Sequence, residues 1–161
     1  MSWMKSIPTL FPNTTNDRVE GEEWVTFDPT NHYPSLHKRL RTHGAITVGI
    51  PYMYQHTAAY PGGLTAACAT NVRAFLCVAD ETQTSAGYYS FTIAGYFKDA
   101  VSSGTVAAGA NVEVLNTGVA FIDDGTTTVQ SANSAGQALD AAASNVVDLW
   151  LHESPVAIAA S

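Results

Sequence analysis

The chain has 161 residues and a formal net charge of −7, and only 13% of its residues are charged. This length supports one domain of ordinary size with a buried core. The charge excludes a phosphate-binding surface over most of the chain, because residues 46–161 carry two basic residues against nine acidic ones. We therefore expect no nucleic-acid partner.

The scarcity of charge is itself a signal, since soluble domains usually carry about 25% charged residues. It indicates that much of the surface meets other protein molecules. The alternative is a free surface covered by neutral polar residues. No apolar run approaches the ~18 residues of a membrane span, and the first residues lack the apolar region of a secretion signal. We expect a protein made in the cytosol, with no membrane partner.

Residues 1–45 are predicted to form an extended N-terminal arm. Prolines at positions 8, 12, 29 and 34 interrupt any regular pattern, yet the segment holds more aromatic residues than a disordered tail would. Two alternatives are open: an arm that becomes ordered against another surface, and an arm that wraps its own domain. Within the segment, Ser35–Arg41 is compatible with a short helix that has Leu36 and Leu40 on one face.

From residue 46 onward the pattern predicts an all-β body with short strands and small-residue turns. Apolar and polar residues alternate with the period of two that is typical of half-buried strands. A hairpin is predicted where Asn116-Thr117-Gly118 separates two apolar runs. The runs that carry these predictions are Ile46–Ile50, Arg73–Ala79, Tyr89–Ile93, Val112–Leu115 and Val119–Ile122.

The last part of the chain contains one ambiguous segment and one clear strand. Residues 135–143 are rich in alanine, which favours a short helix, although Gln137–Asp140 also fits a strand with small side chains in a crowded interior. In the final element Val147, Leu149 and Leu151 alternate with Asp148, Trp150 and His152. We predict a strand whose apolar face points inward. The predicted fold is a small antiparallel β-barrel or sandwich (residues 46–161) with the N-terminal arm.

No pattern in the sequence carries catalytic or metal chemistry. The five histidines, at positions 32, 37, 43, 56 and 152, lack the spacing of metal ligands. Cys68 and Cys77 are interpreted as small core residues. A hydrolase triad around His43 or His56 would need only some Ser and Asp, which a chain so rich in Ser always offers. We predict that the protein is not an enzyme and uses neither metal nor cofactor.

A family resemblance emerges from the order of several weak motifs. They are Phe75–Asp80, Gly87, a strand that ends in Ala94-Gly95-Tyr96-Phe97, Val106–Val114, Gly118-Val119, Gly136–Ala142 and the closing Val147–Leu151 strand. This order resembles the tailed-phage capsid decoration (cement) proteins that have a small β-barrel, over roughly residues 44–153. The resemblance favours a strand at Gln137–Ala141. The N-terminal segment of 45 residues is longer than such proteins usually carry.

The resemblance implies a structural virion protein that sits on the outside of a phage head, commonly as a trimer, and stabilises it. The expected partners are the major capsid protein and further copies of the chain, on the capsid surface of a virion assembled in the host cytoplasm. The arm supplies the aromatic anchors and basic residues expected to bind the capsid: Trp3, Trp24, Phe27, Lys38, Arg39 and Arg41. The alternative is a receptor- or sugar-binding head-fibre module, with Tyr52, Tyr54 and Tyr60 as candidate contacts.

Overall fold

Ten β-strands and their connections make up the part of the chain that the computed structural model describes, residues 20–55, 63–67, 76–115, 119–125 and 134–152. None of these residues is helical, so the all-β prediction is confirmed. The strands are β1 (Glu23–Phe27), β2 (Pro34–Thr42), β3 (Pro51–Gln55), β4 (Gly63–Ala67), β5 (Leu76–Ala79), β6 (Tyr88–Val101), β7 (Asn111–Val114), β8 (Phe121–Asp123), β9 (Gly136–Ala138) and β10 (Val146–Leu151).

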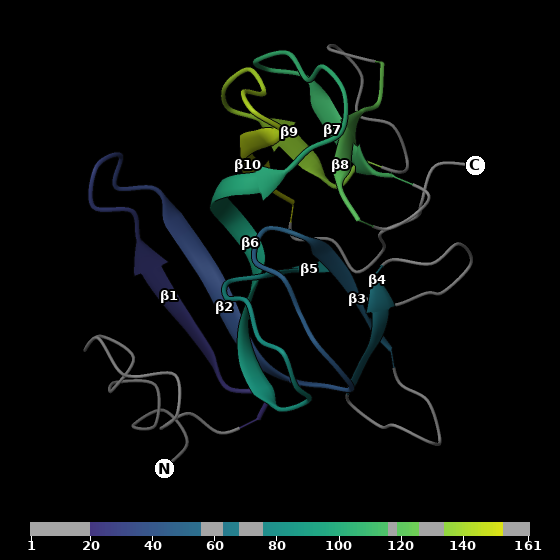
Figure 1. The fold of residues 1–161 in the computed structure, drawn as a ribbon. Coiled ribbons are helices and arrows are strands. Elements are labelled where there is room, and N and C mark those ends of the chain that lie inside the picture. Colours follow the sequence, from purple (N-terminus) through teal and green to yellow (C-terminus); the bar gives the residue numbers. More distant parts are fainter. Residues whose placement is uncertain (1–19, 56–62, 68–75, 116–118, 126–133, 153–161) are drawn as a thin grey trace.

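All ten strands belong to one sheet, in the order β1-β2-β4-β3-β5-β6-β10-β9-β7-β8 (Figure 1). Neighbouring strands run antiparallel except β2 and β4, which are parallel. An additional pairing joins β2 to β6. The pairings among β2, β4, β3, β5 and β6 therefore form a ring within the sheet. The sheet as a whole stays open, with β1 and β8 at its ends, and the fold is sandwich-like rather than one closed barrel.

Strand β6 is the long element that connects the two halves of the molecule (Figure 1). Its first part pairs with β2 and β5, and its last part pairs with β10. Gly95 lies where these pairings meet, because it is in register with both Ser35 and Leu151. Its φ of 83° lies in the left-handed region, and a Cβ atom there would collide with the carbonyl oxygen of Pro34. Only glycine fits both requirements.

A first core fills the space that β2, β3, β5 and β6 surround. Tyr52 and Phe91 meet edge to face there, with ring centroids 6.1 Å apart. Cys77 is fully buried in the same cluster, which confirms its interpretation as a core residue; Cys68 lies outside the described residues. The buried members of this core are Leu40, Ile46, Tyr52, Cys77, Ala79 and Phe91.

A second, larger core lies between the other face of β3 and β5 and the strands β7 to β10. Met53 and Val78 enter it from β3 and β5. Val147, Leu149 and Leu151 enter it from β10 and are at most 2% exposed. The predicted strand and its inward face are therefore confirmed. Each such side chain, when buried, contributes roughly 1.5–3 kcal/mol of transfer free energy.

The N-terminal segment differs from its prediction. Residues Ser35–Arg41 are not helical but form most of β2, which pairs with β1 on one side and with β6 on the other. Two strand partners supply hydrogen bonds along the backbone, and this outweighs the local preference of the segment. From residue 20 onward, then, the segment is part of its own domain, which is the second of the two alternatives. The expected boundary at residue 45 falls inside the sheet, between β2 and β3.

Of the other predicted elements, the structure confirms one hairpin and contradicts one strand. The hairpin between Val112 and Ile122 is confirmed, because β7 and β8 pair antiparallel. Strand β9 covers only the first part of the ambiguous Gln137–Ala141 segment. The predicted strand at Ile46–Ile50 is wrong: Ile46 forms one isolated bridge with Gln83, and Gly49 turns the chain with a φ of 77°. No helix in the described part of the chain is long and apolar enough to cross a membrane.

Candidate functional site

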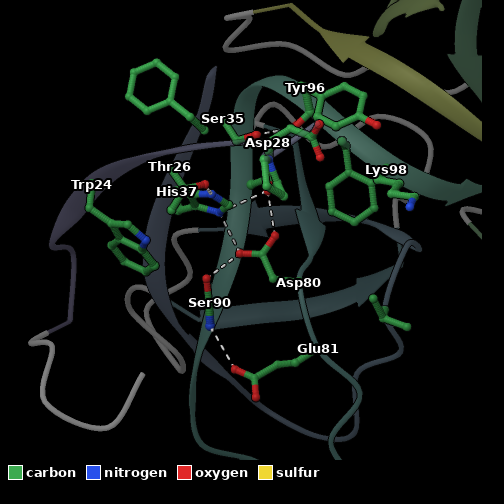
Figure 2. Close-up of a pocket in the computed structure, with 15 residues that line it drawn as sticks. Trp24, Thr26, Asp28, Ser35, His37, Asp80, Glu81, Ser90, Tyr96 and Lys98 are labelled. Atoms are coloured by element: carbon green, nitrogen blue, oxygen red, sulfur yellow. Dashed lines mark hydrogen bonds and ion pairs between the residues drawn. The ribbon is translucent and has the colours of Figure 1, made fainter. Parts of the chain in front are cut away.

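A cavity of about 510 Å³ opens beside β1, β2 and β6 (Figure 2). This volume is within the ~300–1,000 Å³ of typical small-molecule sites. Aromatic rings, hydroxyl groups and three carboxylates line it, together with one lysine. The lining residues come from strands β1, β2 and β6 and from the turns at residues 28–29, 48 and 80–81.

His37 is the centre of a hydrogen-bond network in the wall of this cavity (Figure 2). The Nε2 atom of His37 is 2.6 Å from the hydroxyl of Thr26, and its Nδ1 atom is 2.9 Å from a carboxylate oxygen of Asp80. The indole of Trp24 stacks on the imidazole, with centroids 5.5 Å apart and planes inclined by 17°. Strand β1 thus holds the ring of His37 on one face and on one edge.

Asp80 completes the network from the end of β5. The hydroxyl of Thr92 donates to its Oδ1 at 2.6 Å, and the hydroxyl of Ser90 donates to its Oδ2. The backbone N–H of Ser90 also donates to Glu81 at 3.3 Å. Charge-assisted bonds of this kind are shorter and stronger than neutral ones. The network therefore ties β1, β2, β6 and the end of β5 into one wall.

Strand alternation explains why these polar groups meet. In β6 the apolar residues Tyr89, Phe91 and Ile93 pack in or against the first core, so Ser90 and Thr92 point to the opposite face. On β2, Leu40 faces that core, and His37 lies in register with Thr92. Polar residues of β1, β2, β6 and the end of β5 consequently share the face that points away from the first core. The cavity lies on this face.

The order Thr26–His37–Asp80 is the order of hydrogen bonds in a hydrolase triad. A hydrolase also needs hydrogen-bond donors that stabilise the oxyanion of its transition state. The demonstrable effect of the network is to fix His37 and to join the strands around it.

A second part of the lining keeps unused hydrogen-bonding capacity. The Oδ1 atom of Asp28 accepts the backbone N–H groups of Thr30 and Asn31, at 3.0 and 2.6 Å, in a tight turn. No hydrogen bond among the described residues uses Asp28 Oδ2. Lys98 likewise lines the cavity and forms no ion pair with any described residue.

Tyr96 closes the cavity on the side of β10. Its hydroxyl donates to Asp148 Oδ2 at 2.7 Å, and its ring lies 5.5 Å from that of Tyr33. Burial, and after it the hydrogen bond to Asp148, raise the pKa of Tyr96 far above its usual range. The phenol is therefore neutral, and its hydroxyl donates to the carboxylate of Asp148.

Five of the six residues predicted to bind a capsid lie in the described part of the chain, and their surroundings differ. Trp24 is buried against His37, whereas Phe27 is 65% exposed, and both line the cavity. Lys38 pairs with Glu23 at 2.9 Å, and Arg39 is buried. Arg41 is exposed at the far end of β2, and Trp3 lies outside the described residues.

The tyrosines proposed as sugar contacts are placed differently as well. Tyr52 is buried in the first core, and its hydroxyl accepts the backbone N–H of Thr47 at 2.9 Å. Tyr60 lies outside the described residues, as does the side chain of Tyr54. Sequence reasoning missed His37, Asp80, Ser90 and Thr92; the alternation of polar residues along β6 was the one signal that pointed to this face.

Metal binding has no geometric support in the described ranges. No group of three or more His, Cys, Asp or Glu side chains there could hold a metal ion. The carboxylate of Asp80 is already used by three protein donors.

The described residues define an all-β fold, built on one open sheet of ten strands. No protein-family model matches the chain, and no curated protein matches it. A solved structure that is similar is the N base of the head fiber gp8.5 of bacteriophage phi29. The TM-score is 0.51 at 12% sequence identity, and the match covers 74% of this chain and 96% of that one. A likeness at this identity concerns the fold.

Proposed function

We propose that the chain is a structural protein of a bacteriophage head and is displayed on the capsid surface. The observation that carries this proposal is the fold match, which takes in nearly the whole base of a phage head fiber. The motif order described above, which resembles capsid decoration proteins, supports the same location. Two different comparisons, one of fold and one of motif order, thus favour the outside of a phage head.

Within that location, we propose a decoration protein that binds the major capsid protein and assembles as a trimer. The low content of charged residues supports it, since apolar area is then available for contacts between copies. Exposed apolar side chains such as Val25 and Tyr33 add to that area. The second candidate is the base of a head fibre, which the matched structure favours directly.

Purified virions of the encoding phage test the location and separate the two candidates. Quantitative mass spectrometry of the particles should find the chain together with the major capsid protein. A copy number comparable to that of the capsid protein supports decoration, whereas a small multiple of the number of vertices supports a fibre base. Absence of the chain from intact particles would contradict the proposal in both forms.

The oligomeric state has its own test. Sedimentation of the purified chain at micromolar concentration should show a trimer, because a standard interface of ~800 Å² per partner offers a large gross stabilisation. A monomer would contradict trimers that form before attachment. Cryo-electron microscopy of decorated heads would then tell whether trimers form on the shell.

We also propose that the Thr26–His37–Asp80 network has no catalytic role. The purified chain should hydrolyse p-nitrophenyl acetate no faster than its Thr26→Val variant, which keeps the shape of the side chain but loses the hydroxyl. Hydrolysis that the Thr26→Val change abolishes would contradict this and would establish a hydrolase.

A further inference from the structure

We infer that the cavity beside β1, β2 and β6 is a binding site for a neutral carbohydrate. The inference goes beyond the proposed structural function and does not depend on it, because it rests on the lining of the cavity alone. Four features carry it: an exposed aromatic ring at the cavity, open hydrogen-bonding groups, an acidic lining, and a wall that is held in place before any ligand arrives.

The aromatic ring belongs to Phe27. At 65% it is the most exposed of the large hydrophobic side chains that the structure describes, and it lines the cavity. The face of an aromatic ring is electron-rich and attracts the weakly positive C–H groups of an apolar surface. One face of a pyranose ring presents such C–H groups. A sugar therefore covers Phe27, and the hydroxyl groups on its edge remain free for polar contacts.

Asp28 and Lys98 supply the polar contacts. Asp28 Oδ2 is an open acceptor, and the ammonium of Lys98 is an open donor; the two groups line the same cavity without forming an ion pair with each other. A hydroxyl group both donates and accepts hydrogen bonds. A polyhydroxylated ligand satisfies both residues at once, which a hydrocarbon does not.

The charge of the lining selects against acidic ligands. Asp28, Asp80 and Glu81 contribute three carboxylates to the wall, whereas Lys98 is the one lysine in the lining. A phosphate or a uronic acid would bring a further negative charge into this field. A neutral sugar carries no such penalty.

The hydrogen bonds of His37 preorganise the wall. Thr26 and Trp24 hold the imidazole of His37 from β1, and Asp80 holds it from the end of β5. Phe27 and Asp28 follow Thr26 directly in the chain, so the network also positions the two groups that would contact the sugar. A site that is ordered in advance loses less entropy when its ligand binds.

The experiment uses the full-length chain and a panel of neutral methyl pyranosides: glucoside, galactoside, mannoside and N-acetylglucosaminide. Saturation-transfer NMR identifies the binder, and titration gives its dissociation constant, which for so small a ligand is expected near ~1 mM. Phe27→Ala and Asp28→Asn should each weaken binding by about tenfold. Asp28→Asn retains one side-chain oxygen, which can still accept the backbone N–H groups of Thr30 and Asn31 in the turn.

Tyr88→Ala is the matched control, because Tyr88 is another exposed aromatic, 45% accessible, and it does not line the cavity. It should leave the dissociation constant within about twofold. Methyl glucuronide should bind at least about tenfold more weakly than the neutral glucoside if the acidic lining selects as described.

Three results would overturn the inference. The first is that no member of the panel shows saturable binding up to about 10 mM. The second is binding that Phe27→Ala and Asp28→Asn leave unchanged. The third is that Phe27→Ala abolishes attachment to phage heads while the native chain binds no sugar, which would assign the cavity to the capsid. The presence of the chain in virions is measured separately, so failure here leaves the proposed function intact.

Discussion

Leu149 provides the sharpest test of the fold, because its side chain is fully buried at the centre of the second core. It lies in register with Phe97 on β6 and with Ala138 on β9. Replacing a buried leucine by alanine costs about 2–5 kcal/mol, since transfer free energy is lost and a cavity remains. For a domain of this size about 3 kcal/mol lowers Tm by about 6–12 °C. Leu149→Asp should cost more, above about 4 kcal/mol, because the core then holds a carboxyl group as well.

Chemical denaturation with urea, followed by circular dichroism and tryptophan fluorescence, measures these losses. Leu139→Asp is the control: it makes the same chemical change ten residues earlier in the chain, at a side chain that is 39% exposed. We expect that control to stay within about 0.5 kcal/mol of the native chain. If Leu149→Asp unfolds at the same urea concentration as Leu139→Asp, the inward face of β10 has been assigned wrongly.

Three further predictions concern β6, the network and pH. Gly95→Ala should lower the free energy of unfolding by at least about 2 kcal/mol in denaturant melts, because of its positive φ and the collision with Pro34. Gly104→Ala, with a φ of 76° and open space around it, should show only the smaller loss that comes from the positive φ. Asp80→Ala removes the acceptor of three side-chain donors and should cost about 2 kcal/mol in urea titrations; an unchanged midpoint would refute its structural role. Burial lowers the pKa of His152 below 6.5, so the unfolded state binds more protons and the free energy of unfolding should fall as pH drops below that value; His152→Gln should flatten this part of the pH profile.

The sequence predicted the strands whose burial follows from alternation alone. β10 is the clearest case, because Val147, Leu149 and Leu151 can share one face only in an extended chain. The segment around β2 shows where the reasoning fails. Leu36 and Leu40 are four residues apart, a spacing that places them on the same side of a helix and also on the same side of a strand. The pairing with β6, which lies far along the chain, decides between the two.

The candidate site was less predictable for a related reason. His37 and Asp80 are separated by 43 residues, and they meet because β2 and β5 both pair with β6 in particular registers. Neither residue carries a local motif. The sequence did single out Trp24 and Phe27 as aromatic anchors for a capsid, but it could not show that they line one cavity.

The surroundings of the predicted basic contacts Lys38, Arg39 and Arg41 bear on how the chain would attach to a capsid. Lys38 is paired with Glu23, and Arg39 is buried with its Nη1 atom lacking a hydrogen-bond partner among the described residues. Of the three predicted basic contacts, Arg41 is thus the one that is both exposed and without a described ion pair. One exposed arginine gives little electrostatic steering at physiological ionic strength, where the Debye length is about 8 Å. Arg41 and Lys98 are the two exposed Lys or Arg side chains without an ion pair among the described residues, so we expect any capsid contact that these residues make to be mainly apolar and neutral polar.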